Sequence, residues 1–211
     1  MGKSYQGAYG NYTGKVGNVI ARKSNGRTVL AIYQPIVKNP KTEEQTNQRT
    51  KFGMISKFAS RIGGFISEGF KESGVNTTAY NRFIKKNFED GIGGTFPNFE
   101  LLYNKIKVSS GNLLLPYSPS ALIDSQVVNV SWTNNGGEGN AKDSDKAMIL
   151  VYNSAKGSAV FKLAGAARSV RQDNLTLPTA WNGDSVDIWM AMVSADGELH
   201  SESAYLGNYS I

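Results

Sequence analysis

The sequence predicts a fold in two parts: an α+β N-terminal part, made of a basic β-hairpin and two helices, and an all-β C-terminal sandwich. Three observations support this prediction. An Asn-Gly pair separates two β-type runs near residue 25, apolar residues recur at helical spacing between residues 42 and 88, and six short β-type runs follow residue 126. The length of 211 residues suits one large domain or two small ones.

The segment 1–18 is rich in Gly, Tyr and Asn, and we expect it to be a flexible arm. Its glycines raise the entropic cost of ordering the chain, whereas Tyr5, Tyr9 and Tyr12 offer contact area at low entropic cost. The arm is therefore expected either to become ordered on a partner or to remain a disordered tail.

A β-hairpin is expected around Asn25-Gly26, because a type I′ turn needs positive φ at both central residues and Asn-Gly favours it. The strand residues on either side are Val16, Asn18 and Ile20, then Thr28, Leu30 and Ile32. Arg22, Lys23 and Arg27 lie near the tip, which suits either a phosphate contact or a solvated loop.

Two helices should follow the hairpin. Thr42 is a good N-cap, with Gln45 at the third helical position, and the first turns are polar. One face becomes apolar further along, at Phe52, Ile55, Phe58, Ala59 and Ile62. Gly63-Gly64 should weaken or end this helix, and a second helix is expected over 77–88 with Lys85 and Lys86 on its polar side.

The runs after residue 126 are short, and each is bounded by turn residues. They cover Val128 to Trp132, Ala147 to Tyr152, Ala159 to Leu163, Asp173 to Leu177, Ser185 to Val193 and Ser203 to Leu206. Such spacing predicts an immunoglobulin/fibronectin III-like sandwich with Trp132 in its core, and the lack of cysteine favours the fibronectin type. We expect domains at 19–107 and 123–211, joined by a Ser- and Pro-rich linker at 108–122, and a sandwich that folds alone.

The formal charge of +6 is unevenly distributed: residues 1–110 carry +10 and residues 111–211 carry −4. A basic half beside an acidic half indicates two roles or mutual docking, although solvated lysines explain the pattern equally well. The candidate partner-binding residues are Tyr5, Tyr9, Tyr12, Arg22, Lys23, Arg27, Lys41, Arg49, Lys85 and Lys86.

Few residues here suit catalysis or metal binding. With no cysteine and one histidine, a Cys–His dyad and a His/Cys zinc site are excluded. We expect His200 to be an exposed loop residue, and we expect no enzyme activity, catalytic residue, metal or cofactor. The segment 134–145 carries Glu138, Asp143 and Asp145, whose oxygens could hold calcium, but a strand-connecting turn is the default.

The segment 1–15 contains no apolar core of a signal peptide, and no apolar run approaches the roughly 18 residues of a membrane span. We therefore expect a soluble chain without a signal peptide, in the cytoplasm or in a virion, its location being otherwise unknown.

Several elements resemble an uncharacterised Bacteroidota family of unknown function. They are G-K-V-G-N at 14–18, N-P-K-T at 39–42 and Q-x-x-Q-R at 45–49, with further similar pieces up to residue 207. The second and third elements also resemble small proteins encoded by phages and prophages. The resemblance carries no known chemistry, so it assigns no role to any residue.

These expectations favour a non-enzymatic structural or assembly protein, such as a virion component, whose basic half anchors it and whose sandwich is an interaction module. Its partners would be copies of itself or other assembly proteins. The alternatives are a nucleic-acid-binding protein that uses the basic half and a carbohydrate- or surface-binding module.

Overall fold

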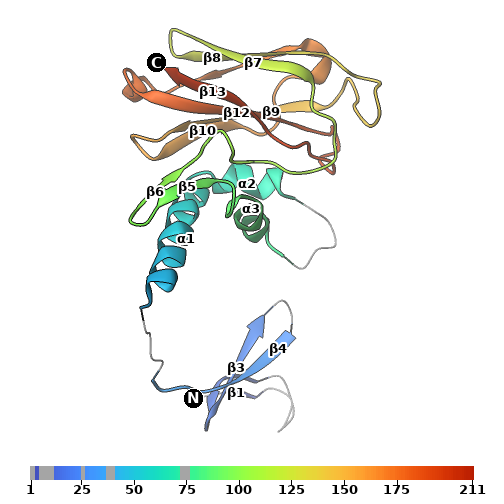
Figure 1. The fold of residues 1–211 in the computed structure, drawn as a ribbon. Coiled ribbons are helices and arrows are strands. Elements are labelled where there is room, and N and C mark those ends of the chain that lie inside the picture. Colours follow the sequence, from blue (N-terminus) through green and yellow to red (C-terminus); the bar gives the residue numbers. More distant parts are fainter. Residues whose placement is uncertain (1–2, 5–11, 25–26, 37–40, 72–76) are drawn as a thin grey trace. The chain divides into compact units, whose positions relative to one another are not determined.

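A computed structural model describes residues 3–4, 12–24, 27–36, 41–71 and 77–211 of the chain (Figure 1). Over these residues the fold is mixed, with three α-helices and four antiparallel sheets. The chain divides into two compact units, Met1–Glu43 and Glu44–Ile211. We describe each unit by itself.

The N-terminal unit is one sheet in the order β1-β2-β3-β4. Its strands are β1 (Lys3–Ser4), β2 (Tyr12–Val16), β3 (Val19–Ser24) and β4 (Arg27–Ile32). The predicted hairpin is confirmed: Ser24 pairs with Arg27, so two residues connect β3 and β4. Val16 belongs to the additional strand β2, and Gly17, with φ of 58°, allows the tight turn into β3. The last part of the segment 1–18, which was expected to be a flexible arm, is therefore the strand β2.

Both predicted helices are present in the C-terminal unit, the first of them in two pieces. They are α1 (Glu43–Arg61), α2 (Gly63–Gly69) and α3 (Ala79–Asn87). The break at Gly63 falls where the glycine pair was expected to weaken the helix. The Thr78 hydroxyl caps α3 by accepting a hydrogen bond from the Asn81 amide at 3.2 Å. Phe52 is 48% exposed, so the buried stripe of α1 begins at Ile55, one turn later than expected.

The strands of the C-terminal unit form two larger sheets and a hairpin. The sheets have the orders β10-β9-β12-β13 and β11-β8-β7, and the hairpin is β5-β6. The strands are β5 (Ile92–Thr95), β6 (Asn98–Leu101), β7 (Tyr117–Asp124), β8 (Val127–Thr133), β9 (Lys146–Asn153), β10 (Ser158–Lys162), β11 (Gln172–Thr176), β12 (Ser185–Val193) and β13 (Ala204–Ser210). All six strands expected after residue 126 are present, and β7 and the hairpin are additional.

The larger sheet is buried on both faces. Val130 and Trp132 of the smaller sheet pack against one face, on which Ile188 and Met190 of β12 lie, so Trp132 is a core residue as expected. Trp189 and the other alternate residues of β9 and β12 face the helices instead. A sheet covered on both faces needs strands that are apolar throughout, which explains the continuous apolar runs of β9 and β12. The unit thus has three layers, with this sheet in the middle (Figure 1).

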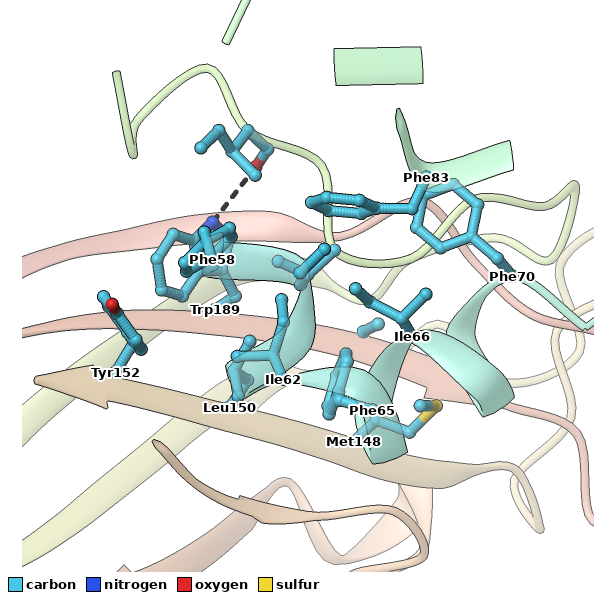
Figure 2. Close-up of a cluster of buried hydrophobic side chains, with 14 of the residues drawn as sticks. Phe58, Ile62, Phe65, Ile66, Phe70, Phe83, Met148, Leu150, Tyr152 and Trp189 are labelled. Carbon is cyan, nitrogen blue, oxygen red and sulfur yellow. Dashed lines mark hydrogen bonds between the residues drawn. The ribbon is translucent and has the colours of Figure 1, made fainter. Parts of the chain in front are cut away.

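Aromatic side chains join the helices to the sheet (Figure 2). The ring of Phe58 on α1 lies 4.8 Å from that of Tyr152 and 6.2 Å from that of Trp189, measured between centroids. The indole Nε1 of Trp189 donates a hydrogen bond to the Ile106 carbonyl at 3.1 Å. Aromatic contacts of this kind add to the stabilisation from burial alone. The helical layer is therefore an integral part of the core.

The segment 108–122 differs from the expected linker. Val108 and Ser109 are fully buried, and the Ser109 hydroxyl donates to the carbonyls of Gly69 and Ser201 at 3.0 and 2.8 Å. The second half of the segment is most of β7, an edge strand that tolerates Pro119 because its outer side needs no amide donor. The division of the chain falls between residues 43 and 44 instead.

A buried ion pair fixes one end of the two sheets. The Arg168 guanidinium, with no exposed surface, contacts the Asp145 carboxylate at 3.0 Å and donates to the Leu114 carbonyl at 2.8 Å. The Arg168 carbonyl accepts a hydrogen bond from the Trp132 indole at 2.9 Å. The acidic segment 134–145 therefore supplies a partner for a buried arginine.

Removing the arginine should be costly, because the Asp145 charge would stay buried without a partner. We expect Arg168→Met to lower the free energy of unfolding by about 3–5 kcal/mol. The double variant Arg168→Met with Asp145→Leu should recover a large part of that loss, as measured by urea unfolding.

The matched control is Lys156→Met, which breaks the exposed pair with Asp184 at 3.3 Å and should cost under about 1 kcal/mol. If the double variant were as unstable as the single one, the unpaired charge would not be the cause.

Because the larger sheet is buried on both faces, the structure also predicts which fragments of the chain can fold alone. A fragment of residues 42–211 should fold cooperatively, because it keeps all three layers. A fragment of residues 120–211 should not, because Trp189 and the rest of the helix-facing side would be exposed to water. The sequence suggested instead that the sandwich folds alone. Circular dichroism with thermal melting of both fragments would decide between these two expectations.

Candidate interaction surface

The N-terminal sheet has two chemically different faces. In an antiparallel sheet, paired residues lie on the same face and successive residues alternate. The pairings Val16 with Val19 and Val19 with Ile32, and Ala21 with Leu30, therefore place these five side chains together on one face. We call it the apolar face.

The opposite face carries three cations, Lys15, Arg22 and Arg27, beside the apolar side chains of Ile20, Val29 and Ala31. Lys15 pairs with Ile20, two residues before Arg22, so Lys15 and Arg22 share this face, and Arg27 of β4 lies on it as well. The Lys15 ammonium lies 3.4 Å from the centre of the Tyr33 ring, a cation–π contact. We call this side the basic face.

The apolar face is largely exposed. Ile32 is 78% exposed, Leu30 56% and Val16 53%, and among the side chains described in this unit only Ala21 is buried. Domains of about 40 residues or fewer seldom bury enough surface to be stable alone. The sheet therefore lacks a core of its own among its described residues.

The N-terminal unit also accounts for the net charge of the chain. It contains seven Lys and Arg against one Glu, a balance of +6, whereas the C-terminal unit contains 16 of each sign. The unequal halves in the sequence thus correspond to a small basic sheet and a larger, electrically balanced unit.

The candidate partner-binding residues fall into both units. Tyr5 and Tyr9 lie outside the described residues, and Tyr12 begins β2. Arg22 and Lys23 are neighbours on β3 and so lie on opposite faces, with Lys23 at the hairpin end of the apolar face. The exposed Arg27 begins β4, and the exposed Lys41 precedes α1.

The remaining candidates belong to the C-terminal unit. Arg49 lies on the exposed first half of α1, and Lys85 and Lys86 lie on α3. The Lys86 ammonium forms an ion pair with Glu202 at 2.9 Å. Sequence reasoning missed the apolar face, whose only signal was the alternation within the hairpin strands.

A groove in the C-terminal unit lies beside α3 and is lined by charged side chains of both signs. Several of its charged side chains have partners within the unit: Arg82 donates to the Phe70 carbonyl, Lys71 donates to the Gly197 carbonyl at 3.1 Å, and Glu202 pairs with Lys86. The groove therefore holds a network of internal contacts.

His200 lines this groove but is buried, with 3% exposure, so the expectation of an exposed loop histidine is wrong. Its Nε2 lies 3.3 Å from Glu68 Oε1, and its Nδ1 has no hydrogen-bond partner among the described residues. Burial lowers the pKa of His200, against the opposing effect of Glu68. The backbone of His200 forms an antiparallel bridge with Val193.

A second buried titratable group lies on the helix-facing side of β12. The Tyr205 hydroxyl donates a hydrogen bond to the Asp187 carboxylate at 2.6 Å. Burial raises the pKa of Asp187 and, together with this hydrogen bond, the pKa of Tyr205. The pair satisfies the polar groups of a buried layer.

Within the described ranges, no group of three or more His, Cys, Asp or Glu side chains is placed to hold a metal ion. Over the same residues, no helix combines the length and apolarity needed to cross a membrane.

The lowered pKa of His200 makes stability depend on pH. Between its unfolded pKa of about 6.5 and its lower folded pKa, the unfolded chain binds a proton that the folded chain resists, so stability should fall as pH decreases through this range and level off below the folded pKa. The slope from this group is at most about 1.4 kcal/mol per pH unit. His200→Gln should weaken this dependence in urea unfolding between pH 7.5 and 5.5, and an unchanged dependence would show that His200 is not its cause.

Comparison with known proteins places the chain in a family but not beside a characterised relative. No curated protein is significantly similar to it. A family of unknown function, DUF6266, matches residues 10–207, which include nearly all of both units. The uncharacterised family expected from the sequence is thus confirmed at this level: the chain belongs to the family of unknown function DUF6266.

Proposed function

We propose that this protein is a non-enzymatic structural or assembly protein, in which the N-terminal sheet is the docking element and the C-terminal unit is the module that it anchors. The observation that carries the proposal is the apolar face: Val16, Leu30 and Ile32 are exposed in a unit where, among described side chains, only Ala21 is buried. Exposed contiguous apolar surface marks interaction sites in soluble proteins.

The C-terminal unit supports the proposal through its covered sheet edges. At one side of the sandwich, Lys162 at the end of β10 pairs with Asp173 of β11 at 2.8 Å. Charged side chains on edge strands discourage uncontrolled strand addition. The outer face of the smaller sheet is polar around Ser120 and Ser131, whose hydroxyls lie 3.0 Å apart. An ion pair at this edge and polar side chains on this face suit a unit that is displayed on an assembly.

The strand order supports a fibronectin III-like assignment of the two sheets. In the constant-type immunoglobulin arrangement, the fourth strand joins the sheet of the first two strands. Here β10, the fourth strand of the sandwich, pairs with β9 in the larger sheet instead. Fibronectin III-like domains are common interaction modules, which agrees with the proposed role.

The nature of the assembly is proposed from the resemblance of the N-P-K-T and Q-x-x-Q-R elements to small phage-encoded proteins. It extends the proposal to a virion component. Thr42 of the first element directly precedes α1, and the second element lies in its first turns, so these elements lie where the chain divides into its two units.

Nucleic-acid binding is the second candidate function, favoured by the basic face. Lys15, Arg22 and Arg27 are all exposed on one side of the sheet, in a unit whose net charge of +6 equals that of the whole chain. Phosphate contacts would use these cations, but they would leave the apolar face in water. The assembly proposal accounts for both faces, because a partner that covers the apolar side leaves the basic side free.

The response of binding to salt concentration distinguishes assembly from nucleic-acid binding. We expect the full chain to associate in sedimentation velocity runs at 0.5 M as well as at 0.05 M NaCl, because apolar contacts are little weakened by screening. A variant lacking residues 1–41 should be monomeric with the near-UV circular dichroism of the folded C-terminal unit.

A nucleic-acid function would instead give duplex or single-strand binding whose log affinity falls with log salt by about 0.9 per neutralised phosphate. The charge-reversed variant Arg22→Glu with Arg27→Glu is the matched control. Loss of association in the charge-reversed variant, together with salt-dependent nucleic-acid binding by the unaltered chain, would reject assembly in favour of nucleic acid.

A further inference from the structure

We infer that the outer face of the smaller sheet of the C-terminal unit binds a neutral glycan, an uncharged polyhydroxylated chain of sugars presented on a surface. The inference goes beyond the proposed assembly function, which concerns the N-terminal sheet, by assigning a ligand to the unit that this sheet anchors. The smaller sheet is an outer layer of the C-terminal unit, and its inner side packs against the larger sheet (Figure 1). Within this unit its outer face is uncovered.

The pairings of β8 with its two neighbours place six exposed side chains on this outer face, because paired residues of antiparallel strands lie on the same side. They form two rows of three across the sheet, centred on β8. Five of the six are neutral hydroxyl or amide side chains, and the sixth is a leucine. We call this set the polar face: Leu122, Asn129 and Asn174 in one row, and Ser120, Ser131 and Gln172 in the other.

The polar face carries no charge, although 19% of the residues of the chain are charged. The next row beyond Asn129 has a single carboxylate, Asp124, at the end of β7. The next row beyond Ser131 contains Tyr117 and Thr133, which are both neutral side chains. Nucleic acid and anionic lipid are held mainly by cations, and the polar face offers none. The absence of charge therefore favours an uncharged ligand.

The amides of the polar face have unused hydrogen-bonding capacity. Gln172 and Asn174 have no side-chain hydrogen-bond partner among the described residues, and the Asn129 amide makes only a long contact of 3.5 Å with the Val127 carbonyl. An amide side chain both donates and accepts hydrogen bonds, as a sugar hydroxyl group does. Because the three amides stand on paired strands, their backbone positions are fixed before a ligand arrives.

An exposed tyrosine borders the polar face. Tyr117 pairs with Thr133 and is 53% exposed, and its hydroxyl donates a hydrogen bond to the Glu138 carboxylate, which orients the ring. Leu122, within the polar face, is 72% exposed. A sugar ring has C–H groups that pack against apolar surface while its hydroxyl groups form hydrogen bonds. The tyrosine ring and the leucine supply that apolar surface beside the amides.

The size of the face suits a glycan chain better than a protein. Strands spaced about 4.8 Å apart and rising about 3.3 Å per residue present roughly 300 Å² over the length of β8. A standard protein interface buries about 800 Å² on each partner. So small a face binds a single ligand weakly. Repeated copies on an assembly would bind a glycan-covered surface much more tightly, because the effective concentration of the remaining sites is high.

A glycan array tests the inference, with the biotinylated full chain clustered on streptavidin so that weak binding is detected. We expect binding to neutral oligosaccharides. Because no ion pair holds them, the signal should be the same at 0.05 and 0.5 M NaCl. A signal confined to sulfated or sialylated glycans and lost at the higher salt concentration would come from the cations of the N-terminal sheet and would overturn the inference.

Charge variants of nearly unchanged shape locate the site. On the neutral glycan with the strongest array signal, surface plasmon resonance should show that Asn129→Asp binds about tenfold more weakly or less, because the variant loses the amide donors. Asn98→Asp is the matched control: it makes the same change at an exposed strand position on β6, a strand that packs on the helical side of the unit, and should bind normally. Equal binding by the two variants would place the site elsewhere.

A second pair of variants adds no charge, in case Asn129→Asp disturbs the sheet. Tyr117→Ala should bind the same glycan about tenfold more weakly, because it removes the apolar ring. Tyr117→Phe keeps the ring and should bind within about threefold of the unaltered chain. Full binding by Tyr117→Ala would contradict the assignment of this face.

The outcomes separate this inference from the proposed function. A blank array for the clustered chain would overturn the glycan site, and association that is lost on removal of residues 1–41 would still support assembly. If the chain binds a neutral glycan through the polar face and removal of residues 1–41 leaves association unchanged, the glycan site stands and the proposed assembly role of the N-terminal sheet falls.

Discussion

The structure depends on one constraint: the central strands of the larger sheet are apolar on both sides, so both sides must be covered. Ile188 and Met190 require the smaller sheet, and Trp189 requires the helices. Strands of this kind cannot form a two-layer sandwich with a solvated outer face. The helical layer, the buried segment at residues 108–109 and the two sheets therefore form a single folded unit, in which no layer is optional.

Local patterns identified most elements but not their partners. Alternation and turn residues located six strands, and the cap at Thr42 located the first helix, since both signals act within a few residues. Burial of Ser109 and of His200 could not be foreseen, because it depends on contacts with segments far away in the sequence. β7 was missed because Pro119 argues against a strand unless the strand is known to lie at an edge. The continuous apolar run at 188–193 did contain a signal that this strand is buried on both faces.

The candidate surface was predictable in composition but not in geometry. Arg22 and Arg27 were recognised as partner-binding candidates from charge alone, whereas the separation of basic and apolar side chains depends on strand register, which the hairpin turn sets. The +6 of the chain also became interpretable only when the division at residue 43 replaced one near residue 110. Charge counted over the wrong boundary made the two parts look like opposites, although one of them is neutral.

The positions of the three tryptophans determine which parts of the molecule their fluorescence reports on. Trp132 and Trp181 lie between the two sheets, and Trp189 lies under the helices, so the three indoles report on two different layers of the C-terminal unit. The N-terminal unit contains no tryptophan, and its aromatic side chains are all tyrosines. Melting of the small sheet would thus be silent in tryptophan emission and visible only through tyrosine. A sharp single transition in indole fluorescence would be compatible with an N-terminal sheet that is already unfolded, or already paired.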